Sequence, residues 1–421
     1  MTKITSDVFG IARGLPLNYV ERPSADEILV ESLTREKHVV IFGSSKQGKT
    51  SLRKHALRDD EYILVQCSNK WDIAEINSAI LKRAGYEITL SNEKSASGKS
   101  KIFAGIKTVF GFGSAEGGAE YVGENGSKTT THPLQLDPED VNDIIQALDA
   151  IGFTKFIVLE DFHYLPIETQ KDFSIALKAY HENSKLCFII IGVWLEEDRL
   201  TLYNGDLKNR LFTVNADKWE AGELLQVIEK GEKLLKIKFS KDFKSELIAE
   251  CFNNVYIVQE ACYQCCQENK IVRTADIEVE IGLPGDAARI VKDVANKDRA
   301  RFIQFLQNFS DGFQATQLHM HKWLLYPILT SNTQALKAGI RYSDLSAKIK
   351  SKHPVGNALN PGNVTQALQS VAALQINKGT KPFILDYDQA NLRLKVVDSG
   401  FIIWLEMQNK DELLEIVDLP T

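Results

Sequence analysis

Short, continuous apolar runs alternate with helical patterns along the first half of the chain. Residues 50–58, 72–85, 137–152 and 168–184 repeat apolar positions at intervals of three and four, which predicts helices. The remaining runs have the length and composition of buried parallel strands: HVVIFG (38–43), EYILVQC (61–67), KFIVLEDFHYL (155–165) and LCFIIIGV (186–193). Because strands and helices alternate, we predict an α/β fold built on a parallel sheet.

Polar residues and prolines predict where two of the helices begin. In the helix over 137–152, Asp137 is the expected N-cap. The lead-in, residues 1–37, turns at Pro23, and Ser24 is the expected N-cap of the helix that follows. One apolar face of that helix is formed by Ile28, Leu29 and Leu33.

Residues 91–133 break the alternation. This segment is rich in glycine, serine, lysine and threonine, with scattered isoleucine and phenylalanine. We expect an insertion in the α/β unit, formed as a hairpin or a mobile loop. A disordered surface loop and a loop that binds a partner or substrate are both consistent with its length and composition.

The second half of the chain is predominantly helical. Residues 218–237, 240–252 and 255–269 predict an all-α unit, and residues 285–297 resemble a polar connection into a third region. In that region helices are predicted over 299–309, 326–339, 341–353 and 361–379, followed by two β-like runs over 383–387 and 392–406. We therefore place boundaries near residues 215 and 285.

The segment between the first strand and the first helix carries the clearest motif. GSSKQGKT, residues 43–50, fits the pattern G-x-x-x-x-G-K-[ST] at each defined position. Such a loop directs backbone N–H groups and a helix N-terminus at phosphates. Lys49 is expected to reach the β- and γ-phosphates of ATP, and Thr50 to bind Mg²⁺. The expected nucleotide-binding residues are Gly43, Ser44, Ser45, Lys46, Gln47, Gly48, Lys49, Thr50 and Ser51. A glycine-serine turn without a ligand is the alternative.

Two acids end a later strand. In FIVLED, residues 156–161, four apolar residues precede Glu160 and Asp161. Glu160 stands where an acid associated with Mg²⁺ is expected, and Asp161 where a carboxylate could orient and deprotonate the attacking water. An ordinary acidic turn after a buried strand is the alternative. Together with the loop motif, the pair favours an ATPase with Lys49, Glu160 and Asp161 as catalytic residues.

With one strand-helix pair between these two motifs, the chain resembles the P-loop ATPases of the AAA+ and STAND group. The resemblance is to archaeal-type ATPases and to replication-initiator ATPases of the origin-recognition kind, and it covers residues 19–270 well and the C-terminal region loosely. It implies a P-loop core over 1–215 with the insertion 91–133, a helical lid over 216–284 and a winged-helix-like domain over 285–421. The segment YVERPSADEILVESL looks like the part that lies over the adenine in those proteins.

The chain departs from that family at several positions. The family usually has Asp before Glu where this chain has Glu160 before Asp161, which implies slow hydrolysis. Its sensor-one strand carries Val193 and Trp194 instead of a polar residue, and its lid lacks the sensor-two arginine. The resemblance makes Arg210 the candidate arginine finger, with Arg199 as a second candidate. Pairing of Arg210 with a local acid such as Asp206 is the alternative.

The resemblance of the C-terminal region to a winged helix leaves DNA and protein as alternative partners. Asn360 is the expected cap of the recognition helix. Base or phosphate contacts could come from Asn363, Thr365, Gln366 and Gln369, and a modest basic edge from Lys348, Lys350, Lys352 and Lys378. A winged helix also serves as a protein-interaction or autoinhibitory module, so a protein partner or a homo-oligomer is equally consistent.

Composition limits the remaining classes. The chain has 421 residues, 50 Lys and Arg against 56 Asp and Glu, and a net charge of -6, which excludes a uniformly basic nucleic-acid coat. No apolar run reaches the length of a membrane span, so we expect no membrane partner and a cytoplasmic location. Six cysteines are too few for a disulfide scaffold, and Cys262, Cys265 and Cys266 are expected to be core thiols rather than metal ligands. We assign no role to His163, His319 or His321.

The sequence therefore predicts an ATP- and Mg²⁺-binding molecular switch that hydrolyses ATP slowly and couples its nucleotide state to DNA or a protein partner. One alternative is a STAND-type signalling or defence ATPase without direct DNA binding. The other is an ATP-binding scaffold that does not hydrolyse.

Overall fold

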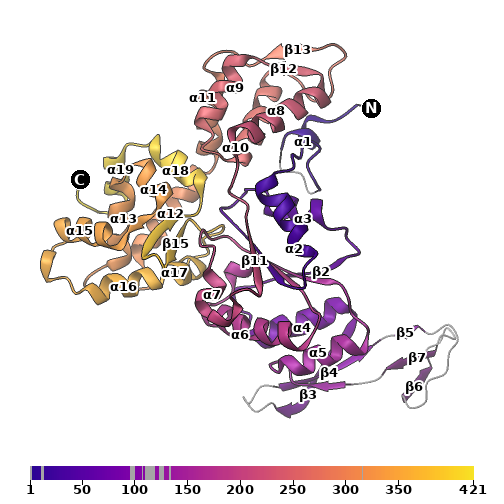
Figure 1. Cartoon of the computed structure of the whole chain (residues 1–421). Helices are drawn as coiled ribbons and strands as arrows, with labels where there is room; N and C mark the ends of the chain where they lie inside the picture. The colour runs from indigo at the N-terminus through magenta and orange to yellow at the C-terminus, as the bar shows by residue number, and fades with distance from the viewer. Residues whose placement is uncertain are drawn as a thin grey trace.

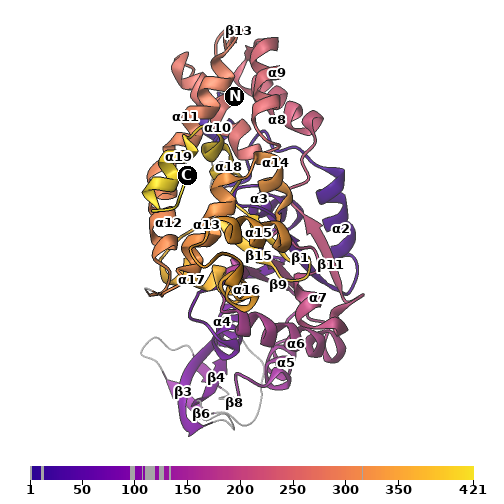
Figure 2. The same ribbon diagram turned by 90° about the vertical axis from the view of Figure 1, so that its left-hand side faces the viewer.

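The computed structural model describes residues 2–10, 14–94, 100–106, 108–109, 119–122, 128–131, 134–314 and 316–421. These residues form three regions in space (Figure 1). The N-terminal half makes an α/β core, the helices between residues 221 and 297 lie above it, and the C-terminal region, drawn in orange and yellow, packs beside both. Turned by 90°, the C-terminal region lies in front of the core sheet (Figure 2).

Five parallel strands form the centre of the core. Their order across the sheet is β11-β1-β10-β9-β2. They are β1 (His38–Phe42), β2 (Tyr62–Gln66), β9 (Phe156–Glu160), β10 (Phe188–Ile191) and β11 (Leu211–Asn215). All residues of β1 and β10 are buried, as continuous apolar runs require. The four predicted strands are confirmed, and β11 is an additional edge strand.

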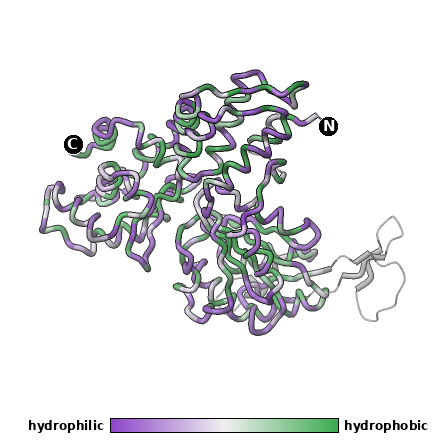
Figure 3. Tube along the Cα trace, turned by 45° about the horizontal axis from the view of Figure 1, so that its top comes forward, coloured by the Kyte–Doolittle hydropathy of each residue, from purple (hydrophilic) through white to green (hydrophobic). Residues whose placement is uncertain are grey.

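Helices cover both faces of this sheet. One face packs against α4 (Ile73–Ala84), α5 (Val141–Ala150) and α6 (Ile167–Asn183) through a cluster that includes Ile80, Leu148 and Phe173. The other face packs against α2 (Ile28–Leu33) and α3 (Lys49–Ala56) through Leu29 and Leu52. Hydrophobic residues accordingly gather inside the core (Figure 3). All four predicted helices of this half are confirmed.

The structure corrects both predicted N-caps. α5 begins at Val141, and Asp140 caps it by accepting a hydrogen bond from the N–H of Asn142. Asp137 instead accepts from the N–H of Glu139 in the preceding turn. In the lead-in, a π-helical turn over Pro23–Glu27 starts directly after Arg22, so Ser24 lies inside it rather than capping it. Ile28 faces solvent, while Leu29 is buried as predicted.

The insertion forms β-structure where the structure describes it. β3 (Tyr86–Lys94), β4 (Ser100–Ile106) and β8 (Leu134–Leu136) make an antiparallel sheet, which confirms the hairpin. The short strands β5 (Thr108–Val109), β6 (Ala119–Val122) and β7 (Lys128–Thr131) make a second one. The rest of 91–133 lies outside the described residues. The insertion projects from the side of the core away from the C-terminal region (Figure 1).

Four helices form the region that we call the lid: α8 (Ala221–Leu235), α9 (Lys241–Glu250), α10 (Val255–Glu268) and α11 (Asp286–Lys297). The prediction that 285–297 is a polar connection is wrong. Ile290, Val291 and Val294 bury one face of α11, while its charged residues cover the exposed face. A parallel pair, β12 (Ile237–Phe239) and β13 (Val279–Ile281), also interrupts the predicted all-α unit. The domain boundaries themselves stay predictions.

The beginning of the chain is attached to the lid. The N–H of Thr5 donates to the carbonyl of Val272 at 3.1 Å, and the N–H of Thr274 donates to the carbonyl of Lys3 at 2.8 Å. A short helix, α1 (Thr5–Val8), follows, and the ring of Phe9 then packs directly on Gly231 of α8. Residues 2–10 thus pack against the lid, and Val8 and Phe9 belong to its hydrophobic core.

We expect Gly231→Ala to destabilise the lid. A Cβ at this position would lie 2.0 Å from Cζ of Phe9, so the ring would have to move out of its site. Overpacking of this kind costs about 1–3 kcal/mol. The melting temperature from circular dichroism should fall accordingly. Gly222→Ala in the same helix meets no atom within 4 Å and is the matched control, for which no loss is expected. Equal melting temperatures for the two variants would contradict this packing.

In the part that the structure describes, the C-terminal region combines eight α-helices with a small sheet. The helices are α12 (Arg299–Asp311), α13 (Met320–Thr330), α14 (Thr333–Ala338), α15 (Tyr342–Lys352), α16 (Pro361–Gln369), α17 (Val371–Asn377), α18 (Ser399–Glu406) and α19 (Lys410–Ile416). The antiparallel sheet has the order β14-β16-β15, with β14 at Ile340–Arg341, β15 at Leu385–Asp388 and β16 at Arg393–Val396. Asn360 caps α16 as predicted, because its Oδ1 accepts from the N–H of Gly362 at 2.9 Å.

Three predictions in this region need correction. The helix predicted over 326–339 is two helices, because α13 runs from Met320 to Thr330 and α14 begins at Thr333. The helix predicted over 361–379 divides at Ser370 into α16 and α17. The β-like run over 392–406 is a strand only up to Val396, and its second half is the helix α18. Five consecutive residues of α18, Phe401 to Leu405, are buried, so the segment lacks the polar face by which a helix is recognised.

Candidate nucleotide site

The glycine loop lies where the sequence predicts, between the carboxyl end of β1 and the first residue of α3. Gly43 has φ +144° and Gly48 has φ +84°, both in the region that favours glycine. A Cβ on Gly43 would also lie 2.6 Å from Oδ1 of Asp217. The first glycine is therefore required by backbone angle and by close contact.

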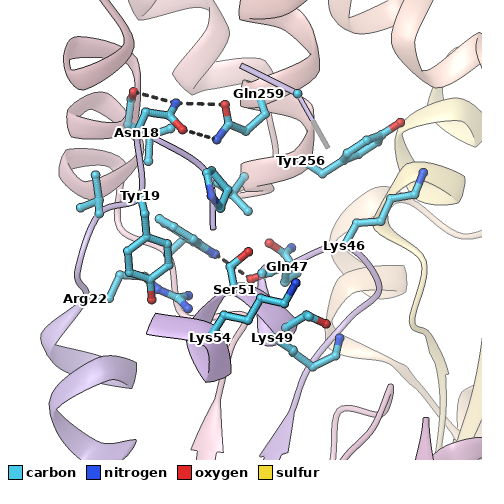
Figure 4. A pocket seen from close by; sticks show the side chains of 18 of the residues that line it. Asn18, Tyr19, Arg22, Lys46, Gln47, Lys49, Ser51, Lys54, Tyr256 and Gln259 are labelled. Atoms are coloured by element: carbon cyan, nitrogen blue, oxygen red, sulfur yellow. Dashed lines mark hydrogen bonds between the residues drawn. The ribbon is translucent and has the colours of Figure 1, made fainter. Parts of the chain in front are cut away.

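A cavity of about 370 Å³ opens beside this loop. Its walls come from three parts of the chain (Figure 4). The loop and α3 contribute Lys46 to Ser51 and Lys54, the lead-in contributes Asn18, Tyr19 and Arg22, and the lid contributes Tyr256 and Gln259. The volume falls in the range of small-molecule sites. Asn18 and Gln259 pair through reciprocal amide hydrogen bonds of 3.0 and 2.9 Å, which tie the lead-in to the lid.

Lys49 is buried at the base of the cavity. Its Nζ donates to the carbonyl oxygens of Gly43, at 3.0 Å, and Ser44. Burial lowers the pKa of Lys49 to about 8, although the carboxylates of Asp217, Asp161 and Glu160 act in the opposite direction. Burial thus disfavours the charged ammonium more than the nearby carboxylates favour it, so an anion bound in the cavity would stabilise the charged form.

The predicted metal-binding pair is brought together. The hydroxyl of Thr50 donates to Oε1 of Glu160 at 2.6 Å, and Nη2 of Arg53 lies 3.8 Å from the other carboxylate oxygen. Mg²⁺ prefers oxygen ligands such as hydroxyl and carboxylate groups. It commonly has only a few protein ligands, and phosphates and water supply the others. The residues present therefore fit Mg²⁺. Their assignment as ligands stays a prediction.

Asp161 lies next to this pair in an unusual backbone conformation. Its φ is +60°, and its carboxylate accepts a hydrogen bond from Nε2 of Gln66 on β2 at 2.9 Å. Because β9 is in the same parallel sheet as β1, Glu160 at the end of β9 and Asp161 after it reach the same edge as the loop. The geometry suits the predicted role in positioning water.

A segment that the sequence did not predict as part of the site supports the loop from the side. Asp217 follows β11, and its carboxylate accepts the N–H of Ser44 at 2.7 and 2.8 Å and the Ser44 hydroxyl at 2.7 Å. Burial raises the pKa of Asp217, while Lys49 and Ser44 oppose the shift. Trp219 donates from Nε1 to the carbonyl of Gln47 at 3.4 Å. The strand LFTVN could have revealed these residues, because the residues that follow a parallel strand lie at the same edge of the sheet as the glycine loop.

Arg210 lies at the opposite edge of the sheet. It directly precedes β11, whose first residue pairs with His38 and whose last pairs with Phe42, next to the loop. Its Nη2 donates to Glu182 at 2.7 Å, and its Nη1 contacts the carbonyl of Asp206. Arg210 is thus paired with an acid, but the acid is Glu182 and not Asp206, whose carboxylate binds Lys178. Arg210 is a full strand length from its own chain's cavity, and a role on a neighbouring chain stays a prediction.

Residues after β10 join the core to the C-terminal region. Trp194 is fully buried, and the second arginine-finger candidate, Arg199, binds both carboxylate oxygens of Asp386 at 2.8 and 2.7 Å. Arg199 therefore has a structural partner. His163 is buried nearby, and neither ring nitrogen has a hydrogen-bond partner among the residues that the structure describes. Burial lowers the pKa of His163 well below its usual value.

The C-terminal region also contacts the glycine loop itself. The N–H of Ser45 donates to the carbonyl of Val397 at 3.4 Å. Lys46 places Nζ 3.6 Å from Oδ2 of Asp298 and 4.0 Å from the ring centroid of Tyr256. The nucleotide loop is thus the place where core, lid and C-terminal region meet.

The predicted DNA-contacting residues are partly used within the chain. Lys348 donates to the Ser331 hydroxyl at 2.9 Å, and Lys352 to the carbonyl of Thr421 at 3.0 Å. Gln366 and Gln369 are exposed on α16. The structure neither groups these residues into a strongly basic face nor removes them from solvent.

The cysteines and the described helices add two observations. Cys262, Cys265 and Cys266 are buried inside α10, and burial raises the pKa of Cys265 to about 12. The prediction that these thiols pack in the hydrophobic core is confirmed. None of the helices in the described ranges has both the length and the apolar character needed to cross a membrane.

We expect nucleotide affinity to depend on the protonation of Lys49. Since the folded pKa is about 8 and the unfolded value about 10.4, the unfolded chain binds more protons between these pH values, and the stability of the nucleotide-free protein rises with pH there. Phosphate binding needs the charged amine. Affinity for ATP should therefore fall by up to about tenfold per unit above pH 8. Calorimetry from pH 6.5 to 9.5 tests this, and Lys49→Arg should remove the dependence if the amine causes it.

Comparison with solved structures shows the fold. A Walker-type ATPase of Pyrococcus abyssi matches with a TM-score of 0.52 at 10% identity, over 93% of this chain and 100% of that chain. The Orc1 protein of Aeropyrum pernix in complex with DNA gives a TM-score of 0.45, and Cdc6p from Pyrobaculum aerophilum 0.40, each at 10% identity and with 97% or more of both chains covered. No family model and no curated protein matches the sequence. The predicted fold class, a P-loop core with a lid and a winged-helix-like domain, is confirmed.

Proposed function

We propose that this chain binds ATP with Mg²⁺, hydrolyses it slowly, and uses the nucleotide state to change how its C-terminal region engages a partner. One observation carries the proposal. The hydroxyl of Thr50 and the carboxylate of Glu160 meet at 2.6 Å, beside the buried Lys49 and below a cavity of nucleotide size. A structural glycine turn would not need a buried lysine and a converging acid at the same edge.

Each residue of the site has a separate role in the proposed reaction. Lys49 exchanges the carbonyls of Gly43 and Ser44 for the β- and γ-phosphates, which satisfies its charge better. Thr50 and Glu160 would hold Mg²⁺, which neutralises charge on the transferring phosphoryl group. Asp161 orients the attacking water and accepts its proton. Its carboxylate is one methylene shorter than that of a glutamate, which is the basis for slow turnover.

Contacts at the loop favour a protein-directed switch of the STAND type. Val397 accepts the N–H of Ser45, one of the amides that a phosphate would use, and Arg199 and Asp386 hold the core to the C-terminal region. A bound phosphate would compete with the carbonyl of Val397 for the N–H of Ser45 and so change this contact directly. A partner that binds the released C-terminal region would therefore sense the nucleotide.

DNA engagement is the second candidate. The observation in its favour is that α16 keeps Gln366 and Gln369 exposed at the position of a recognition helix. Binding through such a surface depends on phosphate contacts and must weaken steeply with salt. Absence of salt-sensitive DNA binding by the ATP-loaded protein at low ionic strength would remove this candidate.

Two measurements on the wild-type protein test the proposal. Calorimetry with ATP should give binding that is stronger with Mg²⁺ than with chelator, and phosphate release should be slow but above the protein-free blank. Binding without release leaves a non-hydrolysing scaffold and refutes the ATPase assignment. No binding of ATP in either condition refutes the proposed function as a whole.

A further inference from the structure

We propose that Lys46 is a second phosphate ligand of the nucleotide site, and that Asp298 and the nucleotide's terminal phosphate compete for its ammonium group. The inference rests on the proposed function and extends it, because it names the residue that passes phosphate occupancy to the C-terminal region. It starts from the fact that the loop contains two lysines, of which only Lys49 belongs to the motif.

Lys46 has the position of a phosphate ligand. It lies inside the glycine loop, two residues before Gly48, has φ +63° and lines the same cavity as Lys49 and Thr50. In Figure 4 its side chain extends away from Lys49 and towards Tyr256 of the lid. A flexible lysine stem allows the ammonium to turn back over the loop, where phosphates would sit against the backbone amides.

The present partners of Lys46 hold it weakly. The pair with Asp298 is 3.6 Å long, and both side chains are 35% exposed, so solvent screens the attraction. The ring of Tyr256, 4.0 Å away, adds a cation–π contact. The several negative charges of a bound triphosphate outcompete one solvated carboxylate.

Asp298 connects this lysine to the rest of the chain. It joins α11 to α12, and Nη2 of Arg301 lies 3.4 Å from Asp298 and 2.5 Å from Asp398. Asp398 is the N-cap of α18 and follows Val397, the residue that accepts the N–H of Ser45. Ion pairs therefore connect the glycine loop, through Asp298 between α11 and α12, to Asp398 in the C-terminal region.

The other cations that line the cavity are less suited to this role. Arg22 donates to the carbonyl of Ala216 at 2.8 Å and lies 4.1 Å from the ring centroid of Trp219, so it is fixed. Lys49 has the motif role, and Lys54 lies one turn into α3, farther from the phosphate loop. Lys46 contacts both the lid, through Tyr256, and the α11–α12 junction, through Asp298.

Three variants of the full chain test the competition, with calorimetry of ADP and of a non-hydrolysable ATP analogue in the presence of Mg²⁺. Lys46→Met should weaken binding of the ATP analogue by about tenfold, and of ADP less. Asp298→Asn should tighten binding of the analogue by about twofold to threefold, because the competing charge is gone. The double variant should bind like Lys46→Met, since Asp298 acts through Lys46.

A matched control separates this role from loss of a surface charge. Lys297→Met removes the neighbouring lysine, which pairs with Glu260 at 3.6 Å and does not line the cavity, and should leave both affinities unchanged. If Lys46→Met fails to fold, the tighter binding of Asp298→Asn, in which Lys46 is intact, still decides the question. Equal affinity of Asp298→Asn and wild type, or of Lys46→Met and wild type, overturns the inference. Failure of the wild type to bind either nucleotide overturns the proposed function instead.

Discussion

Lys49→Ala is expected to weaken ATP binding by about a hundredfold or more without unfolding the protein. The ammonium of Lys49 is the buried positive charge at the base of the cavity, and alanine removes that charge from the phosphates. Stability should be nearly unchanged, because burial already penalises the charged form, as its lowered pKa of about 8 indicates. Calorimetry with Mg²⁺ and ATP measures the first effect, and thermal unfolding without nucleotide the second.

The matched control for this variant is Lys155→Ala. Lys155 is exposed and precedes β9, so it lies at the edge of the same sheet opposite to the loop. Its replacement should leave ATP affinity within experimental error of the wild type. Wild-type affinity in Lys49→Ala would mean that the loop does not bind phosphates, and a large loss of stability would mean that Lys49 acts mainly in folding.

Asp161→Asn is expected to retain ATP binding and to lower phosphate release by about two to four orders of magnitude. The amide keeps an oxygen that can accept the hydrogen bond from Gln66, so the turn after β9 should persist. It cannot accept a proton from water. Phosphate release at saturating ATP measures the loss, and affinity measured separately should change only severalfold.

Asp172→Asn, the same substitution at an exposed position of α6, is the control. It should hydrolyse ATP at the wild-type rate. If release by Asp161→Asn is also unchanged, Asp161 does not accept the proton, and the order of Glu160 and Asp161 then has no effect on catalysis.

The parts of the fold that could be predicted from sequence are those in which local pattern and burial agree. β1 and β10 are buried on both faces, so their apolar runs are continuous. The glycine loop is equally local, since its spacing and the helix that follows lie within a dozen residues. Glu160 and Asp161 could be placed because a buried parallel strand leads directly into them.

In the elements that the sequence did not predict, local pattern and burial disagree. β11 is an edge strand with a single buried residue, so its pattern is weak. α18 is buried on all sides and resembles a strand, whereas the charged residues of α11 obscured its one apolar face. Asp217 meets Ser44 across 173 residues of chain, and Asp298 meets Lys46 across a still longer separation. Contacts of this kind depend on tertiary structure and have no signature in local sequence.

The attachment of the first residues to the lid has a practical consequence for following motion in this molecule. Lys3 exchanges hydrogen bonds with Thr274 at 2.8 Å, through both its N–H and its carbonyl, so the two segments should travel together. A fluorophore at residue 3 and a second one on an exposed residue of the core, such as Lys155, would therefore form a distance gauge between lid and core. The gauge leaves the cavity, the glycine loop and the charges around Lys46 untouched.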